Sequence, residues 1–292
     1  MDVPRANRKR PVTNSAATPV ALCADDYAMS EAVDSGIRRL ADAGRLTAVS
    51  CLTVSPRWRL SAVAISGFSG AVDIGLHFSL TEFSPLGSMR RLAPGGSLPA
   101  LRELLPSALC GRLDRAEVSA EFARQYDAFC HAFGRPPRFV DGHHHVHQLP
   151  VVRDAIAEFL ADAAPQAWVR NTATTAGRLV ARPAAMGRTA FLARLGVVGR
   201  RRWRAARLAT NADFAGIRSF RERQPYRLLF RRFVAGARPG LLVMSHPGEA
   251  DAMASDSAVR AGELAYLSGP HFADDMAAAG CRLARLSDHA GR

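Results

Sequence analysis

A run of histidines is the first feature of this sequence that could do chemistry. It reads Asp141-Gly-His143-His144-His145-Val-His147, so that four histidines fall within five positions. Neutral imidazole is a preferred ligand of Zn²⁺ and other late first-row metals. The four rings cannot all reach one ion from an extended or turning backbone, so we expect one or two ligands, and substrate or supporting roles for the rest. Asp141 could orient one ring through its free nitrogen. The alternative is a solvent-exposed loop that binds metal only adventitiously.

Three other positions carry groups that could complete a site. In the adjacent pair Asp25-Asp26, one carboxylate could bind a metal while the other takes a proton from water, although a helix cap or turn pair before Ser30 is the plainer interpretation. His77 lies in an apolar run, where a histidine is more often a core residue. His246 precedes Pro247-Gly248 and is either a catalytic acid or a turn residue. Two histidines and one aspartate would suit metal-assisted hydrolysis, but spacing alone does not name the bond that is cut.

The elements that position these residues alternate along the chain. Helices are predicted after Ser30, at 117–133 and at 151–163, because apolar residues recur there with helical spacing. Strands are predicted at 20–23, 46–54, 72–78, 138–141, 167–169, 240–245 and 281–286. Strands that alternate with helices indicate a parallel sheet, hence an α/β barrel or a doubly wound sheet. The candidate residues fall at the carboxyl ends of strands, which share one face in such folds.

The length of 292 residues allows one large domain. We expect residues 1–17 to form a disordered basic leader, and residues 18–290 to form a single domain in which 172–237 is an arginine-rich helical insertion or lid. The five cysteines are scattered without CxxC spacing, which argues against a disulfide framework or a thiolate zinc site. No signal peptide or spanning segment is predicted, and a cytoplasmic location is the default expectation.

The charge is strongly basic, with a formal net charge of +13. Arginines at 200–202, 204 and 207 surround Trp203. One interpretation is a solvated helical insertion. Another is docking at the inner face of the membrane, with arginines on anionic headgroups and Trp203 at the interface. Nucleic-acid binding is disfavoured, because no recognised nucleic-acid module accompanies the charge.

Four motifs together resemble the YdjC-like carbohydrate deacetylases, also called the ChbG/HpnK family. They occur in the family's order and at comparable spacing across about 18–290, and they read CADDYAMS from Cys23, GLHFSLT from Gly75, FVDGHHHVH from Phe139 and SHPG from Ser245. The family usually has Phe where this chain has Tyr27 and Ser where it has Gly142, and neither change removes a ligand. The 172–237 segment matches the family poorly and is expected to help set the substrate.

The resemblance implies an incomplete or distorted (β/α) barrel that removes N-acetyl groups from amino sugars. One divalent metal ion, Zn²⁺ or Mg²⁺, would be held by Asp26, His77 and His143. Asp25 would be the general base and His246 the general acid. The substrate-binding residues would be Asp141, His145, His147 and Arg170.

The expected partner is an acetylated amino sugar, either an oligosaccharide or a lipid-linked sugar such as a glycosyl hopanoid. Peripheral membrane contact and a homodimer are compatible with the sequence. The alternative from another class is a non-catalytic basic protein that binds a membrane surface or polyanion through the arginine-rich segment.

Overall fold

The computed structural model describes residues 17–68, 70–182, 185–219 and 224–288, and within them an all-parallel sheet of eight strands. Apart from Ala17, the predicted basic leader lies outside the described residues. The strand order is β5-β4-β3-β2-β1-β7-β6, and β8 pairs with β1 alone. The strands are β1 (Thr18–Tyr27), β2 (Ala48–Cys51), β3 (Asp73–Phe78), β4 (Phe139–Gly142), β5 (Trp168–Val169), β6 (Asp213–Ala215), β7 (Leu241–Ser245) and β8 (Cys281–Leu283).

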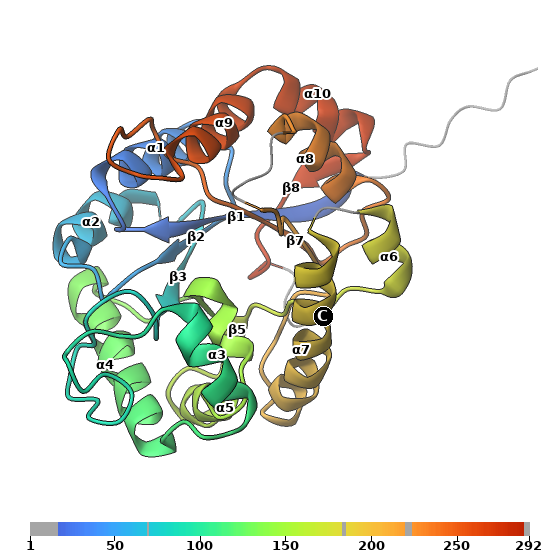
Figure 1. Ribbon diagram of the computed structural model, residues 1–292. Coiled ribbons are helices and arrows are strands. Elements are labelled where there is room, and N and C mark those ends of the chain that lie inside the picture. The colour runs from blue at the N-terminus through green and yellow to red at the C-terminus, as the bar shows by residue number, and fades with distance from the viewer. Residues whose placement is uncertain (1–16, 69, 183–184, 220–223, 289–292) are drawn as a thin grey trace, which may run out of the picture.

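The sheet curls into an incomplete barrel with helices around its outer side (Figure 1). Between its outermost strands β5 and β6, a single bridge joins Val169 to Thr210. Beyond this bridge, side-chain amides replace a regular ladder, because the Asn171 backbone N–H donates to Asn211 Oδ1 at 2.7 Å and Asn211 Nδ2 donates to the Asn171 carbonyl at 2.8 Å. The prediction of an incomplete or distorted barrel is confirmed.

Helices connect successive strands on the outside of the sheet. They are α1 (Glu31–Asp42), α2 (Trp58–Ile65), α3 (Leu101–Leu109), α4 (Arg115–Phe133), α5 (Val152–Ala163), α6 (Ala176–Ala181), α7 (Met186–Ala205), α8 (Tyr226–Val234), α9 (Ser257–Ser268) and α10 (His271–Ala278). Short 3₁₀ helices occupy Ser66–Phe68 and His143–Gln148. Ser30 caps α1 as predicted, since its side chain accepts from the Val33 N–H. No described helix is long and apolar enough to cross a membrane.

The 172–237 segment contributes to the sheet as well as to its surroundings. It holds α6, α7 and α8, but also β6, a strand that the sequence reasoning missed. β6 has only three residues, all buried, so it presents no alternating pattern to read. It pairs with β7 from Asp213↔Leu241 to Ala215↔Val243 and therefore forms one edge of the barrel.

Trp203 does not lie at a surface, so the expectation that it reaches a membrane interface is wrong. Its relative exposure is 0%. Arg202 binds Asp154 at 3.0 Å and Glu158 at 3.2 Å, which ties α7 to α5. The Arg200 guanidinium donates to the Ala212 carbonyl at 2.8 Å. The helical spacing of α7 directs Trp203 into the core. Some of the neighbouring arginines form ion pairs and hydrogen bonds within the protein.

Side chains of neighbouring strands pack closely against one another in the core. The Phe139 and Trp168 rings stack with centroids 4.2 Å apart. A Cβ atom added at Gly75 would come within 2.4 Å of the Phe139 ring, so the glycine before His77 is required by packing against β4. At the amino-terminal end of the barrel, Ser287 Oγ donates to Asp73 Oδ1 at 2.6 Å, which brings the chain after β8 across to the start of β3.

Candidate active site

The carboxyl ends of the strands bring the predicted residues together. β1 ends in an irregularity, where its pairing with β2 shifts register between Ala24 and Tyr27. Asp26 takes a left-handed φ of 68° at this point, and both Asp25 and Asp26 line the same cavity. In a regular strand, adjacent side chains would point to opposite faces. The irregularity is therefore what allows both carboxylates to reach one site.

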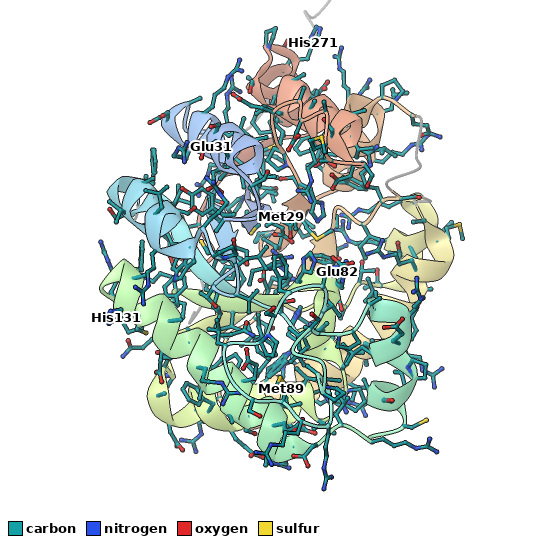
Figure 2. All side chains as sticks on the ribbon, turned by 60° about the vertical axis from the view of Figure 1, so that its left-hand side comes forward. Met29, Glu31, Glu82, Met89, His131 and His271 are labelled. Atoms are coloured by element: carbon teal, nitrogen blue, oxygen red, sulfur yellow. The ribbon has the colours of Figure 1, made fainter. Side chains whose placement is uncertain are left out.

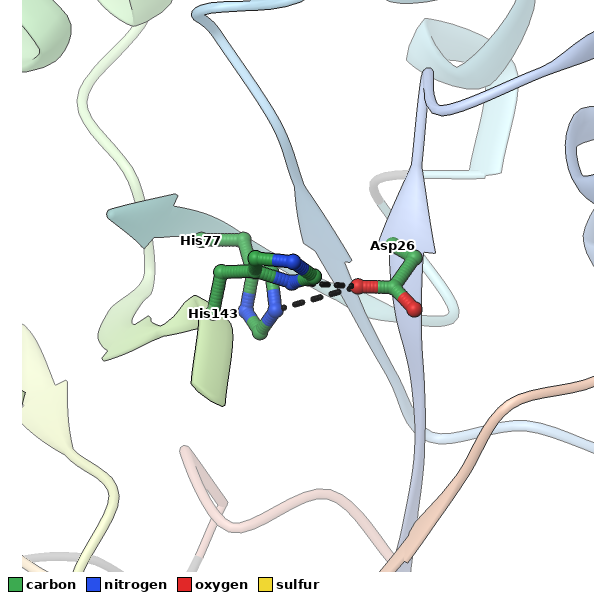
Figure 3. A group of neighbouring side chains, drawn as sticks. All are labelled: Asp26, His77 and His143. Carbon is green, nitrogen blue, oxygen red and sulfur yellow. Dashed lines mark hydrogen bonds and ion pairs between the residues drawn. The ribbon is translucent and has the colours of Figure 1, made fainter. Parts of the chain in front are cut away.

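Asp26, His77 and His143 form the candidate metal cluster (Figure 3). Asp26 Oδ1 lies 3.3 Å from His77 Nε2 and 3.0 Å from His143 Nδ1. All three residues are buried, and their ligand atoms lie within 4.8 Å of one another. Two imidazoles and one carboxylate are a donor set that suits Zn²⁺, so the residues present fit a divalent ion.

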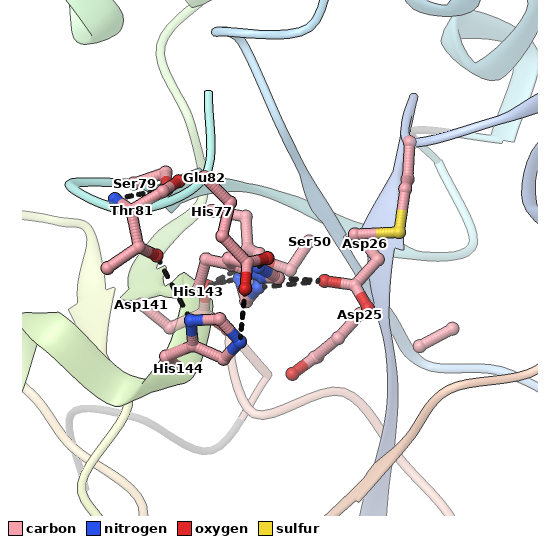
Figure 4. Close-up of polar contacts among 12 residues, drawn as sticks. Asp25, Asp26, Ser50, His77, Ser79, Thr81, Glu82, Asp141, His143 and His144 are labelled. Atoms are coloured by element: carbon pink, nitrogen blue, oxygen red, sulfur yellow. Dashed lines mark hydrogen bonds and ion pairs between the residues drawn. The ribbon is translucent and has the colours of Figure 1, made fainter. Parts of the chain in front are cut away.

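The next layer of contacts orients His77 (Figure 4). His77 Nδ1 lies 2.6 Å from Asp141 Oδ1, its partner across the β3–β4 ladder. Ser50, at the end of β2, lies 2.9 Å from the same nitrogen and also donates to Asp141 Oδ1. A carboxylate on the far nitrogen of a ligand histidine fixes the ring and leaves the other nitrogen facing the metal. Asp141 therefore lies where it could orient the His77 ring.

Arg170 lies just after β5, and its guanidinium forms ion pairs with the carboxylates of Asp25 and Asp141. Its Nη1 and Nη2 donate to the two oxygens of Asp25, each at 2.6 Å, and Nη2 lies 2.5 Å from Asp141 Oδ2. Burial alone would raise the pKa of Asp141, but Arg170 and His77 lower it to about 2. A two-pronged guanidinium contact fixes the plane of a carboxylate as well as its charge.

The histidine run divides into separate roles because His144 and His145 adopt left-handed φ values of 54° and 60°. His144 Nδ1 lies 3.0 Å from Thr81 Oγ1, and its Nε2 faces Glu82 at 3.9 Å. His145 lines the cavity. His147 is fully buried, with Nε2 3.0 Å from the Arg170 carbonyl oxygen.

Three of the four predicted substrate-binding residues lie behind the cavity. The 510 Å³ cavity is lined by His145, but not by Asp141, His147 or Arg170. These three residues are fully buried among one another, so the structure places them behind the cavity wall and not on it. Their contacts orient Asp25 and His77 instead.

His246 lies at the end of β7 and also lines the cavity. Burial lowers its pKa to about 4. Its backbone N–H donates to Glu263 Oε2 at 2.7 Å, and Glu263 lies 3.3 Å from Arg218. Burial raises the pKa of Glu263 to about 7. A buried carboxyl from α9 therefore holds the turn that carries His246.

Sequence reasoning missed several residues of the cavity. Arg260, from α9, donates to Asp26 Oδ2 at 2.8 Å and is itself held by Asp256 at 2.6 Å. Burial would raise the pKa of Asp26, but Arg260 and the two histidines hold it well below its usual range. Glu82 lies 3.4 Å from His143 Nε2. Glu82 directly follows the GLHFSLT motif, so its place next to that motif could have identified it from the sequence. No sequence pattern marks Arg260.

The comparisons with known proteins agree with this arrangement. The family model described as YdjC-like protein matches residues 19–278. Chitooligosaccharide deacetylases of Escherichia fergusonii and Serratia marcescens are each 34% identical, over 139 residues (48% of this chain and 54% of the relative) and 137 residues (47% and 53%) respectively. The alignments thus span about half the length of these curated relatives.

One solved structure has the same fold over nearly the whole chain. It is a protein of Enterococcus faecalis V583, named only provisionally as a cellobiose-phosphate cleavage protein, with a TM-score of 0.69 and 18% identity over 94% of this chain and 99% of that one. At that identity the likeness shows the fold alone. The parallel half-barrel with its polar site at the carboxyl ends of the strands defines an α/β barrel-like protein, and the chain belongs to the YdjC-like family.

Proposed function

We propose that this chain is a metal-dependent N-deacetylase that acts on an acetylated amino sugar. The observation that carries the proposal is the pairing, in one cavity, of a buried Asp26–His77–His143 cluster with a separate carboxylate, Asp25. The names of the two deacetylase relatives support the same reaction class. The substrate would be an oligosaccharide or a lipid-linked sugar such as a glycosyl hopanoid.

Asp26, His77 and His143 would hold the ion, with Zn²⁺ or Mg²⁺ as candidates. When bound there, a divalent ion supplies positive charge that polarises the scissile amide and favours ionisation of water. Zn²⁺ fits the two imidazoles more closely, since Mg²⁺ prefers oxygen ligands.

The protein's own groups handle the protons. Asp25 takes a proton from the attacking water as the new C–O bond forms at the acetyl carbon, and Arg170 holds its carboxylate in place. The C–N bond then breaks, acetate is released, and the amine nitrogen takes a proton. The proton that Asp25 takes from the water balances the proton that the amine gains, and His246 is the proposed donor to the amine nitrogen. Burial lowers the pKa of His246 to about 4, which favours its giving up a proton.

The test is acetate release from a panel of N-acetylglucosamine-containing substrates, including lipid-linked ones, with metal-reconstituted protein. Asp25→Asn and His143→Ala should each lower the rate on the order of a hundredfold or more. Asp127→Asn and His131→Ala are matched controls on α4, where both side chains are exposed. Figure 2 shows His131 at the outer edge of the molecule, away from Glu82 at the cavity.

Metal content separates the parts of the proposal. His143→Ala should lose the ion, whereas Asp25→Asn should retain it and still be inactive. Wild-type protein that binds one ion per chain but releases no acetate from any substrate would refute the deacetylase reaction and leave the metal site standing. Undiminished acetate release by both variants would refute the assigned roles.

A further inference from the structure

The loops at the face of the barrel opposite the cavity carry an excess of positive charge. We define this amino-terminal face as the described loops that lead into strands, residues 43–47, 70–72, 134–138, 164–167, 206–212, 235–240 and 279–280. These loops contain no acidic residue. Their arginines are Arg45, Arg135, Arg138, Arg207 and Arg238. Parallel strands place all these loops at one end of the barrel.

The cavity end of the same barrel has no such excess. In the described loops that follow β1 to β7, the arginines are Arg57, Arg90, Arg91, Arg170 and Arg218, and the acids are Glu82, Glu249, Asp251 and Asp256. Both ends therefore carry five arginines in these loops, and the difference lies in the acidic residues, which the amino-terminal loops lack. The charge is therefore distributed by position in the fold and not only by the abundance of arginine.

Three hollows lie at this end of the barrel, between the defined loops and the residues next to them, and each is lined by two arginines. One of 310 Å³ lies beside Arg135 and Arg138, between the loops before β4 and β5. A second of 310 Å³ lies at the open seam of the barrel beside Arg200 and Arg204. A third of 520 Å³ lies beside Arg282 and Arg285, where Arg285 is paired with Asp288 at 2.7 Å and Arg282 is exposed.

The arginine pair at the seam brings two positive charges close together. Burial lowers the pKa of Arg200, and the positive charge of Arg204 lowers it further. Arg204 lies four residues along α7, so the two guanidiniums share one side of the helix. Both line the same hollow, so a phosphate placed there would meet two cations.

We propose that the amino-terminal face docks on an anionic phospholipid surface, with the cavity directed away from it. Separate arginine hollows at one end of the barrel fit the headgroups of a planar membrane, whereas a nucleic acid would call for a continuous basic track. Exposed large apolar side chains are absent from the described loops of this face, so binding is electrostatic and reversed by salt.

The experiment is sedimentation of the full chain with phosphatidylcholine vesicles, with and without about 30% phosphatidylglycerol. The test variant reverses one exposed arginine of each hollow, Arg138→Glu, Arg204→Glu and Arg282→Glu. Each basic residue near an anionic surface contributes about 1 kcal/mol, so the partition coefficient should fall on the order of a hundredfold. The matched control reverses three exposed arginines elsewhere, Arg59→Glu, Arg90→Glu and Arg112→Glu, with the same change in net charge.

Loss of binding in the test variant, with binding kept by the control and abolished for wild type at about 0.5 M salt, would support the proposal. Equal loss in both variants would reduce the effect to net charge and overturn it. Failure of the wild type to pellet with the anionic vesicles would also overturn it, as would duplex DNA binding that the test variant loses in the absence of any vesicle binding. Acetate release from a water-soluble substrate should be unchanged in the test variant, because the proposal does not depend on the deacetylase reaction.

Discussion

Arg170 offers the most direct test of how the site is held together. Its guanidinium is fully buried and contacts both Asp25 and Asp141. In Arg170→Met, the two carboxylates stay buried without their shared cation. Breaking a buried ion pair by removing one partner costs about 3–5 kcal/mol. We expect a loss in that range for the free energy of unfolding of the metal-free protein.

Arg170→Lys tests whether a positive charge at this position is sufficient or whether the planar geometry of the guanidinium is also required. A lysine ammonium restores one positive charge but cannot donate to both Asp25 oxygens in a fixed plane. We therefore expect Arg170→Lys to recover part of the stability of Arg170→Met, and to remain impaired in acetate release on the order of tenfold or more.

Urea unfolding followed by circular dichroism gives the stability, and acetate release gives the activity. The carboxylates provide an internal control, because Asp25→Asn in the Arg170→Met background removes the charge whose ion pair was with Arg170 and should recover stability. A loss of less than about 1 kcal/mol in the free energy of unfolding of Arg170→Met would contradict the role assigned to the contacts of Arg170 with Asp25 and Asp141. Acetate release by Arg170→Lys at the wild-type rate would contradict it as well.

Three further outcomes follow from other buried groups. Arg260→Met should weaken Zn²⁺ affinity about tenfold in a competition titration with a chelating dye, because Asp26 loses the partner that orients its carboxylate; unchanged affinity would count against this role. The pKa of Glu263 is raised to about 7 in the fold, so its stabilising contribution is full below the unfolded value of about 4.3 and is lost as the pH rises through about 7. Stability should therefore fall by roughly 3–4 kcal/mol over that range, and Glu263→Gln should flatten the profile in urea unfolding at successive pH values. Trp203→Ala should lower the free energy of unfolding by about 3–5 kcal/mol, whereas exposed Arg201→Ala should change it by less than about 0.5 kcal/mol.

The parts of the fold that could be predicted from sequence are those with a local signal. The cap at Ser30 and the strand before His77 follow from residue type and apolar runs within short windows. The shared face of Asp26, His77 and His143 then follows from parallel pairing alone, since strand ends meet at one edge.

The parts that could not be predicted depend on contacts between distant positions. Arg260 reaches Asp26 across 234 residues, and its own surroundings on α9 resemble any other charged helix position. Whether Arg170 touches substrate or only carboxylates depends on its depth behind the cavity, which no sequence pattern records. Trp203 shows the same limit, because an arginine-rich helix can still turn one aromatic residue into the core.

Asp26 shows that backbone irregularity itself can be part of the site. Its φ of 68° is a conformation that asparagine and aspartate tolerate but a β-branched residue does not. Asp26→Asn should therefore keep the turn at the end of β1 while it loses metal affinity. Asp26→Val should lose metal affinity too, and in addition about 1–2 kcal/mol of stability relative to Asp26→Asn in the metal-free protein. Urea unfolding of the two variants measures that difference. If Asp26→Val were as stable as Asp26→Asn, the left-handed turn would not be what brings Asp25 and Asp26 into one cavity.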